Sequence, residues 1–93
     1  MPDRIHARHP DPDKQGTTID AAKYRAVRDA IEAELADGPV MLSDLRRAVK
    51  ARIGDTFEGS VSWYVMAVKL DLEARGTIER VPRQTPQHLR LVG

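Results

Sequence analysis

The chain has 93 residues, enough for one small domain and too few for two. Its 41% apolar and 31% charged residues are typical of a soluble globular protein and exclude a wholly disordered one. No apolar run approaches the roughly 20 residues that span a bilayer. The N-terminal residues show no apolar signal core, so we expect a cytoplasmic protein. The lack of cysteine excludes disulfides and thiol catalysis.

The net charge of +1 hides two basic and two acidic segments. Residues 38–54 carry four basic residues and one acidic residue, net +3, and residues 76–93 carry three and one, net +2. Residues 19–37 and 55–75 are each net −2, and residues 1–18 are neutral. A polyanion could therefore use a basic face only if folding brings the two basic segments together.

Residues 1–18 hold three of the six prolines and few large apolar side chains, so we expect an extended arm that precedes a domain over residues 19–93. His6 and His9 lie in this arm, and His88 lies far along the chain. Because no helical register joins the three rings, we expect ordinary titratable groups, with no metal and no cofactor.

The first helix should begin after Asp20, whose carboxylate can accept backbone N–H groups of the first turn. Ile19 and Tyr24 have the spacing of a hydrophobic staple around this cap. The apolar side chains repeat at helical spacing at Tyr24, Val27, Ile31 and Leu35. Gly38 and Pro39 end the helix.

A second helix should follow the short extended pair Val40–Met41, with Ser43 as its cap. Its inner face is Leu45, Ala48, Val49 and Ile53. Gly54 ends it at a position suited to a left-handed backbone. Phe57, in the loop that follows, should pack into the core.

A third helix should run from the cap Ser60 to about Arg75, with Gly76 as its terminator. It carries one apolar stripe at Val61, Val65, Val68 and Leu72. A second stripe lies on roughly the opposite side at Trp63, Ala67, Leu70 and Ala74. Residues 77–81 and 89–92 then read as a β-hairpin with a proline-containing tip.

This order of elements resembles the winged helix-turn-helix fold, a mainly α fold of three helices and a small β-hairpin, the wing. Two segments carry the resemblance: Gly38-Pro39-Val40-Met41-Leu42-Ser43-Asp44-Leu45 and Leu72-Glu73-Ala74-Arg75-Gly76-Thr77-Ile78-Glu79-Arg80. The first resembles the strand that leads into helix two. The second resembles the end of a recognition helix before the wing. Winged helices serve both nucleic-acid binding and protein interaction, so the resemblance specifies the fold better than the function.

A closer resemblance involves the run from Ser60-Val61-Ser62-Trp63-Tyr64 through Val68-Lys69-Leu70-Asp71-Leu72-Glu73-Ala74-Arg75-Gly76, with Gly16-Thr17-Thr18-Ile19-Asp20 in the arm. These residues are similar to a family of small, uncharacterised bacterial proteins. That family implies no established activity.

The winged-helix resemblance implies duplex DNA as a partner, with helix three in the major groove. The leading hypothesis is a nucleic-acid-binding or transcription-related module that uses helix two and the wing. The expected phosphate contacts are Arg46, Arg47, Lys50, Arg80, Arg83 and Arg90. The expected base contacts are Ser60, Ser62, Met66 and Lys69. Asn, Gln and Arg, the usual base readers, are missing from helix three before Arg75, which weakens this hypothesis.

The alternative is a protein-interaction or dimerisation module that uses Trp63, Ala67 and Leu70. By the winged-helix template these apolar side chains lie where groove-facing residues usually sit, so something should bury them. We expect a homodimer, another protein, or docking of the N-terminal arm. Trp63 itself is expected either to anchor packing within the chain or to be a hot spot of such an interface.

Catalysis is not expected. None of Ser43, Ser60 and Ser62 lies in a Gly-x-Ser-x-Gly turn, and Ser43 and Ser60 suit helix caps. The chain has no glycine-rich phosphate loop and no evident small-molecule substrate site.

Overall fold

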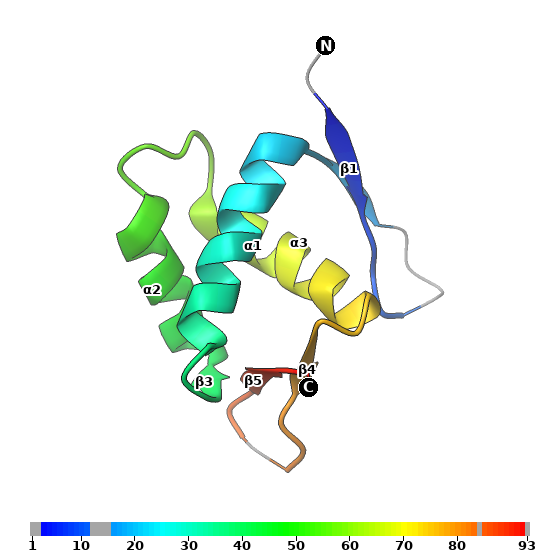
Figure 1. The fold of residues 1–93 in the computed structure, drawn as a ribbon, viewed down its shortest axis with the longest axis vertical. Coiled ribbons are helices and arrows are strands. Elements are labelled where there is room, and N and C mark those ends of the chain that lie inside the picture. Colours follow the sequence, from blue (N-terminus) through cyan, green and yellow to red (C-terminus); the bar gives the residue numbers. More distant parts are fainter. Residues whose placement is uncertain (1–2, 12–15, 84, 93) are drawn as a thin grey trace.

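The computed structural model describes residues 3–11, 16–83 and 85–92, which form three helices and two small sheets (Figure 1). The elements in chain order are β1 (Arg4–Ala7), β2 (Thr17–Asp20), α1 (Ala21–Leu35), β3 (Val40–Met41), α2 (Leu42–Ile53), α3 (Val61–Ala74), β4 (Ile78–Arg80) and β5 (His88–Leu91). None of the helices in these described residues is both long and apolar enough to cross a membrane.

Helix α1 begins and packs as its sequence predicts. The Asp20 carboxylate accepts a hydrogen bond from the Lys23 backbone N–H at 3.1 Å. Ile19 and Tyr24, the expected staple pair, are both buried in the core. The same core takes the rest of the helix's apolar face, Val27, Ile31 and Leu35.

The beginning and the end of α2 correct two expectations. The helix starts at Leu42, so Ser43 is inside its first turn and is not the cap. The Leu42 amide instead donates to the Gln87 carbonyl at 2.9 Å, so strand pairing replaces a side-chain cap. The backbone of Gly54 is in the right-handed helical region, with φ of −58°. The helical turn continues past it, and the Phe57 amide donates to the Ile53 carbonyl at 2.9 Å.

Helix α3 has the predicted ends. The Ser60 hydroxyl accepts from the Trp63 amide at 3.2 Å, and Gly76 has φ of +78°, the left-handed conformation that glycine adopts without strain. The stripe Val61, Val65, Val68 and Leu72 is buried. Val65, Val68 and Leu72 are nearly inaccessible, so this is the inner face of the helix.

The C-terminal hairpin forms as predicted and gains a third strand. β4 and β5 pair antiparallel, with Ile78 opposite Leu91, and β3 pairs with the other edge of β5, with Val40 opposite Leu89. Gln84, at the tip, lies outside the described residues. Figure 1 shows this sheet at the end of the molecule opposite the N-terminus.

The N-terminal arm differs from the expected extended segment, because β1 and β2 form an antiparallel pair with Ile5 opposite Ile19. β2 crosses the boundary expected at residue 18 and leads directly into α1. Gly16 is required here: a Cβ atom at this position would lie 1.8 Å from the Ala7 carbonyl oxygen. We call β1, β2 and the described residues between them the N-terminal hairpin.

Candidate interaction site on helix α3

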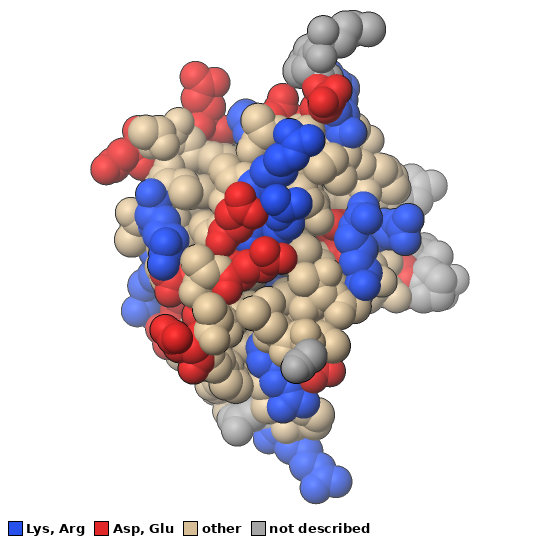
Figure 2. All heavy atoms as spheres, in the orientation of Figure 1, with Lys and Arg blue, Asp and Glu red and all other residues tan. Residues whose placement is uncertain are grey.

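The basic residues expected to contact DNA fall into two groups. Arg46, Arg47 and Lys50 are exposed on α2, and Arg47 lies 3.8 Å from Asp44. Arg80 and Arg83 are exposed in and after β4. On the face of the molecule that carries α1, basic and acidic side chains are interleaved and form no single basic field (Figure 2).

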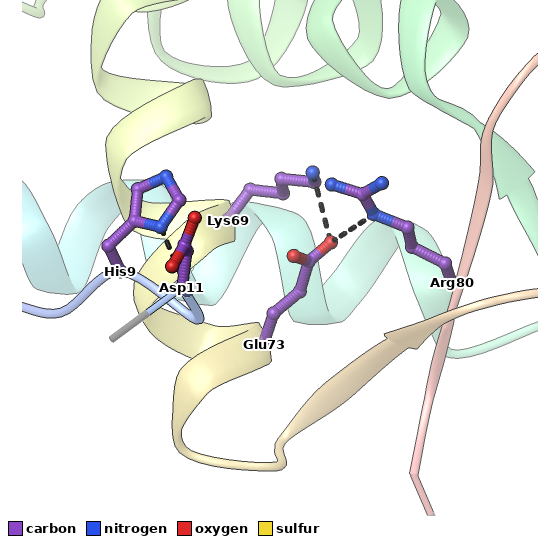
Figure 3. Close-up of polar contacts among 5 residues, drawn as sticks. All are labelled: His9, Asp11, Lys69, Glu73 and Arg80. Carbon is purple, nitrogen blue, oxygen red and sulfur yellow. Dashed lines mark hydrogen bonds and ion pairs between the residues drawn. The ribbon is translucent and has the colours of Figure 1, made fainter. Parts of the chain in front are cut away.

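Lys69 corrects the expectation that it contacts bases. Its side chain is 1% exposed, and its Nζ atom lies 2.9 Å from Glu73 Oε1. Figure 3 shows that Arg80 reaches the same carboxylate from β4, with Arg80 Nε 3.4 Å from Glu73 Oε1. Burial lowers the pKa of Lys69, and the contact with Glu73 opposes that shift. Lys69 therefore belongs to an internal ion-pair cluster and cannot reach a nucleic acid in this conformation.

Asp71, two residues further along α3, is fully buried and joins three parts of the fold. Its Oδ1 accepts the Arg8 backbone N–H at 2.7 Å, which attaches the N-terminal hairpin to α3. Its Oδ2 accepts from the Tyr24 hydroxyl of α1 and from Arg75 Nε at 2.8 Å. Burial and the hydrogen bond to Asp71 raise the pKa of Tyr24 to about 12.

The second apolar stripe of α3 faces the N-terminal hairpin, and the two enclose a shallow hollow of about 230 Å³ that we call the apolar hollow. The helix contributes Trp63, Met66, Ala67 and Leu70. The hairpin contributes Ala7, Arg8, His9, Gly16 and Thr17. Docking of the arm against this stripe, one of the expected outcomes, is therefore what the structure has.

Trp63 is only half covered. Its side chain is 50% exposed, while Ala67 and Leu70 are intermediate. Its indole packs edge-to-face on the Tyr64 ring, with centroids 4.9 Å apart, and Tyr64 packs the same way on Phe57. Tyr64 and Phe57 both pack against the core, so the indole is held in place at the edge of the hollow.

Two other expected nucleic-acid contacts, Ser60 and Ser62, meet Lys50 at the N-terminus of α3. The three residues line a second hollow of about 200 Å³ between the end of α2 and the start of α3. Within the described part of the chain, Lys50 has no ion-pair partner. At this hollow the structure brings together predicted phosphate and base contacts from α2 and from the start of α3.

His9 and His88 each contact a residue two positions away in the chain. His9 Nδ1 accepts the Asp11 backbone N–H at 3.0 Å, as Figure 3 shows, and His88 Nδ1 lies 2.7 Å from the Pro86 carbonyl. Across residues 3–11, 16–83 and 85–92, no three His, Asp or Glu side chains gather as metal ligands.

Sequence reasoning missed the buried roles of Lys69, Asp71 and Glu73. A signal for them was present, because Lys69–Glu73 and Asp71–Arg75 have the i,i+4 spacing that lets opposite charges pair along a helix. Nothing in the local pattern shows that these pairs face inward.

The chain belongs to a protein family of unknown function, DUF6958, whose family model matches residues 4–89. The match covers the N-terminal hairpin from its first strand, all three helices and most of the C-terminal hairpin. The search of curated proteins finds no match, and neither does the search of solved structures.

Proposed function

We propose that this chain is a non-catalytic winged-helix module that binds another polypeptide at the apolar hollow. The observation that carries the proposal is Trp63, a large aromatic side chain held rigidly at the edge of an apolar concavity and left 50% exposed. Buried or half-buried aromatic anchors next to such concavities dominate the energy of protein interfaces.

The order of elements after the N-terminal hairpin supports the winged-helix part of the proposal. Helix α1, strand β3, helices α2 and α3 and the β4–β5 hairpin follow one another in the winged-helix order. The pairing of β3 with β5 joins the segment before α2 to the wing. The three helices therefore pack beside one small sheet of three strands.

The position of the N-terminal hairpin favours protein over DNA as the partner of α3. A recognition helix must enter the major groove with one free face. In this chain the outer face of α3 is occupied by hairpin residues, among them Ala7 and Thr17, and Lys69 is buried. The remaining surface, around Trp63, is apolar and suits a protein side chain better than a phosphate.

Site-specific crosslinking tests the proposal. A photoreactive phenylalanine analogue in place of Trp63 should form a covalent adduct with a second polypeptide in cells that produce the protein. The same analogue in place of the exposed Arg25 on α1 is the control and should not. The adduct should disappear when Leu70 is changed to Ser in a variant whose circular dichroism is unchanged. Absence of any adduct specific to position 63 would exclude a polypeptide at this face.

The hollow between α2 and α3 favours nucleic-acid backbone binding as a second candidate function. Lys50, Ser60 and the start of α3 present a cation, a hydroxyl and a helix N-terminus to one point, all of which suit a phosphate. If Arg46, Arg47 and Lys50 neutralise one phosphate each, log Kd should change with log salt by a slope of about 2.7. Lys50→Glu should weaken binding of random duplex DNA, and Arg25→Glu should not. Binding weaker than about 10⁻⁴ M at physiological salt would exclude this candidate.

A further inference from the structure

The wall of the apolar hollow carries positive charge on one side only. Arg8 is exposed and, within the described residues, has no ion-pair partner. Beside it, His9 accepts a hydrogen bond at Nδ1, so its Nε2 atom carries the proton and can donate. None of the described residues that line the hollow is acidic. The hollow therefore combines an apolar floor on α3 with unneutralised donors on the hairpin.

The size of the hollow restricts what fits. Its volume of about 230 Å³ is below the roughly 300–1,000 Å³ of sites that enclose cofactors and metabolites. A single large side chain from a partner fills a space of this kind, with the rest of the partner lying across the rim. Trp63 and Leu70 would contact that side chain, and Arg8 would contact whatever flanks it.

We propose that the partner at this face is a different protein, which inserts one large apolar side chain flanked by a carboxylate. The apolar side chain fills the hollow against Trp63 and Leu70, and the Asp or Glu carboxylate accepts hydrogen bonds from the Arg8 guanidinium. This inference rests on the proposed function and adds the chemistry of the partner to it.

Charge argues against a second copy of the chain as the occupant. In a two-fold dimer the same patch meets itself, so Arg8 of one copy would face the lining of the hollow on the other copy. The described lining supplies no carboxylate to pair with it. An acidic segment of another protein supplies the missing acceptor.

Selection from a phage-displayed library of random 12-residue peptides tests the chemistry. The wild-type protein should enrich peptides with Leu, Ile or Phe within three positions of Asp or Glu. Arg8→Glu should instead enrich Lys or Arg beside the same apolar residues. This substitution keeps the Arg8 backbone N–H that bonds to Asp71. Arg4→Glu, a charge reversal on β1 outside the hollow, should select like the wild type.

The best selected peptide, synthesised without Trp, should then change the fluorescence of Trp63, the one tryptophan in the chain. Its Kd should rise about tenfold or more in Arg8→Glu and stay unchanged in Arg4→Glu. If peptides that need Trp63 bound Arg8→Glu as tightly as the wild type, the inference of an acidic partner would be wrong and the proposed function would stand. Failure to select any peptide that needs Trp63 would overturn both. A dimer in sedimentation that Trp63→Ala dissociates would assign the face to a second copy and overturn the inference.

Discussion

The Tyr24 hydroxyl donates a hydrogen bond to Asp71 Oδ2 and so connects α1 to α3 in the interior. Asp71 also accepts the backbone N–H of Arg8, which holds the N-terminal hairpin against α3. The apolar hollow lies between this hairpin and α3, so this buried carboxylate helps to fix its shape. The proposed interaction site therefore rests on a polar contact inside the fold.

The raised pKa of Tyr24 predicts a loss of stability at alkaline pH. Burial and Asp71 raise this pKa from its ordinary value of 10.0 to about 12. The folded state then holds the phenolic proton where the unfolded state has lost it, so this contribution is complete below pH 10 and is lost as pH rises through 12. It amounts to roughly 2 to 3 kcal/mol. Urea unfolding between these pH values should show the loss in the wild type and not in Tyr24→Phe. If the unfolding free energies of the wild type and of Tyr24→Phe changed equally over this pH range, the Tyr24–Asp71 contact would be contradicted.

Removal of the Asp71 carboxylate should detach the hairpin as well as destabilise the core. Asp71→Ala leaves the Tyr24 hydroxyl, Arg75 and the Arg8 amide without their acceptor, which should cost about 3 to 5 kcal/mol. Hydrogen exchange should accelerate at Arg8 and its neighbours in β1. Asp29→Ala, which removes an exposed carboxylate that pairs with Arg28, should change the unfolding free energy by about 0.5 kcal/mol or less. Unchanged protection of β1 in Asp71→Ala would show that other contacts hold the hairpin.

The inner stripe of α3 could be predicted from sequence, whereas Lys69 and Asp71 could not. Periodicity correctly separates Val65 and Leu72 from Trp63, because it needs only the geometry of one helix. It assumes, however, that polar residues face water. Helix α3 is covered by α1, by β4 and by the N-terminal hairpin, so little of its circumference is left to solvent. The β1–β2 pairing escaped prediction because it joins residues far apart in the arm, and strands of four residues leave almost no pattern.

The Lys69–Glu73–Arg80 cluster predicts a large loss of stability when Glu73 is changed and a small one when Lys69 is changed. Glu73→Gln leaves the Lys69 ammonium buried without its carboxylate and should cost about 3 to 5 kcal/mol. Lys69→Met removes the buried charge, while Arg80 still pairs with Glu73, so stability should change by about 1 kcal/mol or less. Denaturant unfolding of both variants checks this contrast.

The lowered pKa of Lys69 adds a pH signature to the same cluster. The folded state holds the Lys69 proton less tightly than the unfolded state does, so stability from this group rises as pH rises toward its ordinary pKa of 10.5. Glu73→Gln should therefore recover part of its loss between neutral pH and about pH 9.5. If Glu73→Gln lost the same unfolding free energy at both pH values, the Lys69 ammonium would have found another partner.

The stability cost of replacing Gly76 should depend only on how easily the new residue adopts a positive φ. Its φ is +78°, and a Cβ atom there would meet nothing within 4 Å, so no steric clash adds to the conformational penalty. Gly76→Val should cost about 1 to 3 kcal/mol, because a β-branched residue resists this conformation. Gly76→Asn, which enters the left-handed region more readily, should cost clearly less. Thermal unfolding of the two variants gives the order, and equal losses would point to a cause other than φ.

Leu72 and Trp63 lie on opposite faces of α3 and should separate folding from binding. Leu72 is 2% exposed, and Leu72→Ala should cost about 2 to 5 kcal/mol of unfolding free energy. Trp63 is 50% exposed, so Trp63→Ala should cost about 2 kcal/mol or less, because much of the indole is already in water. Binding should show the reverse order: Trp63→Ala should lower the affinity for a partner peptide by about thirtyfold or more, as expected of a hot-spot residue. Leu72→Ala, tested at a temperature below its own unfolding midpoint, should bind the peptide with nearly wild-type affinity. Denaturant unfolding and peptide titration of the two variants measure both orders. If Trp63→Ala instead destabilised the fold as much as Leu72→Ala and left binding intact, Trp63 would be a packing anchor and the α3 face would lose its place as the interaction site.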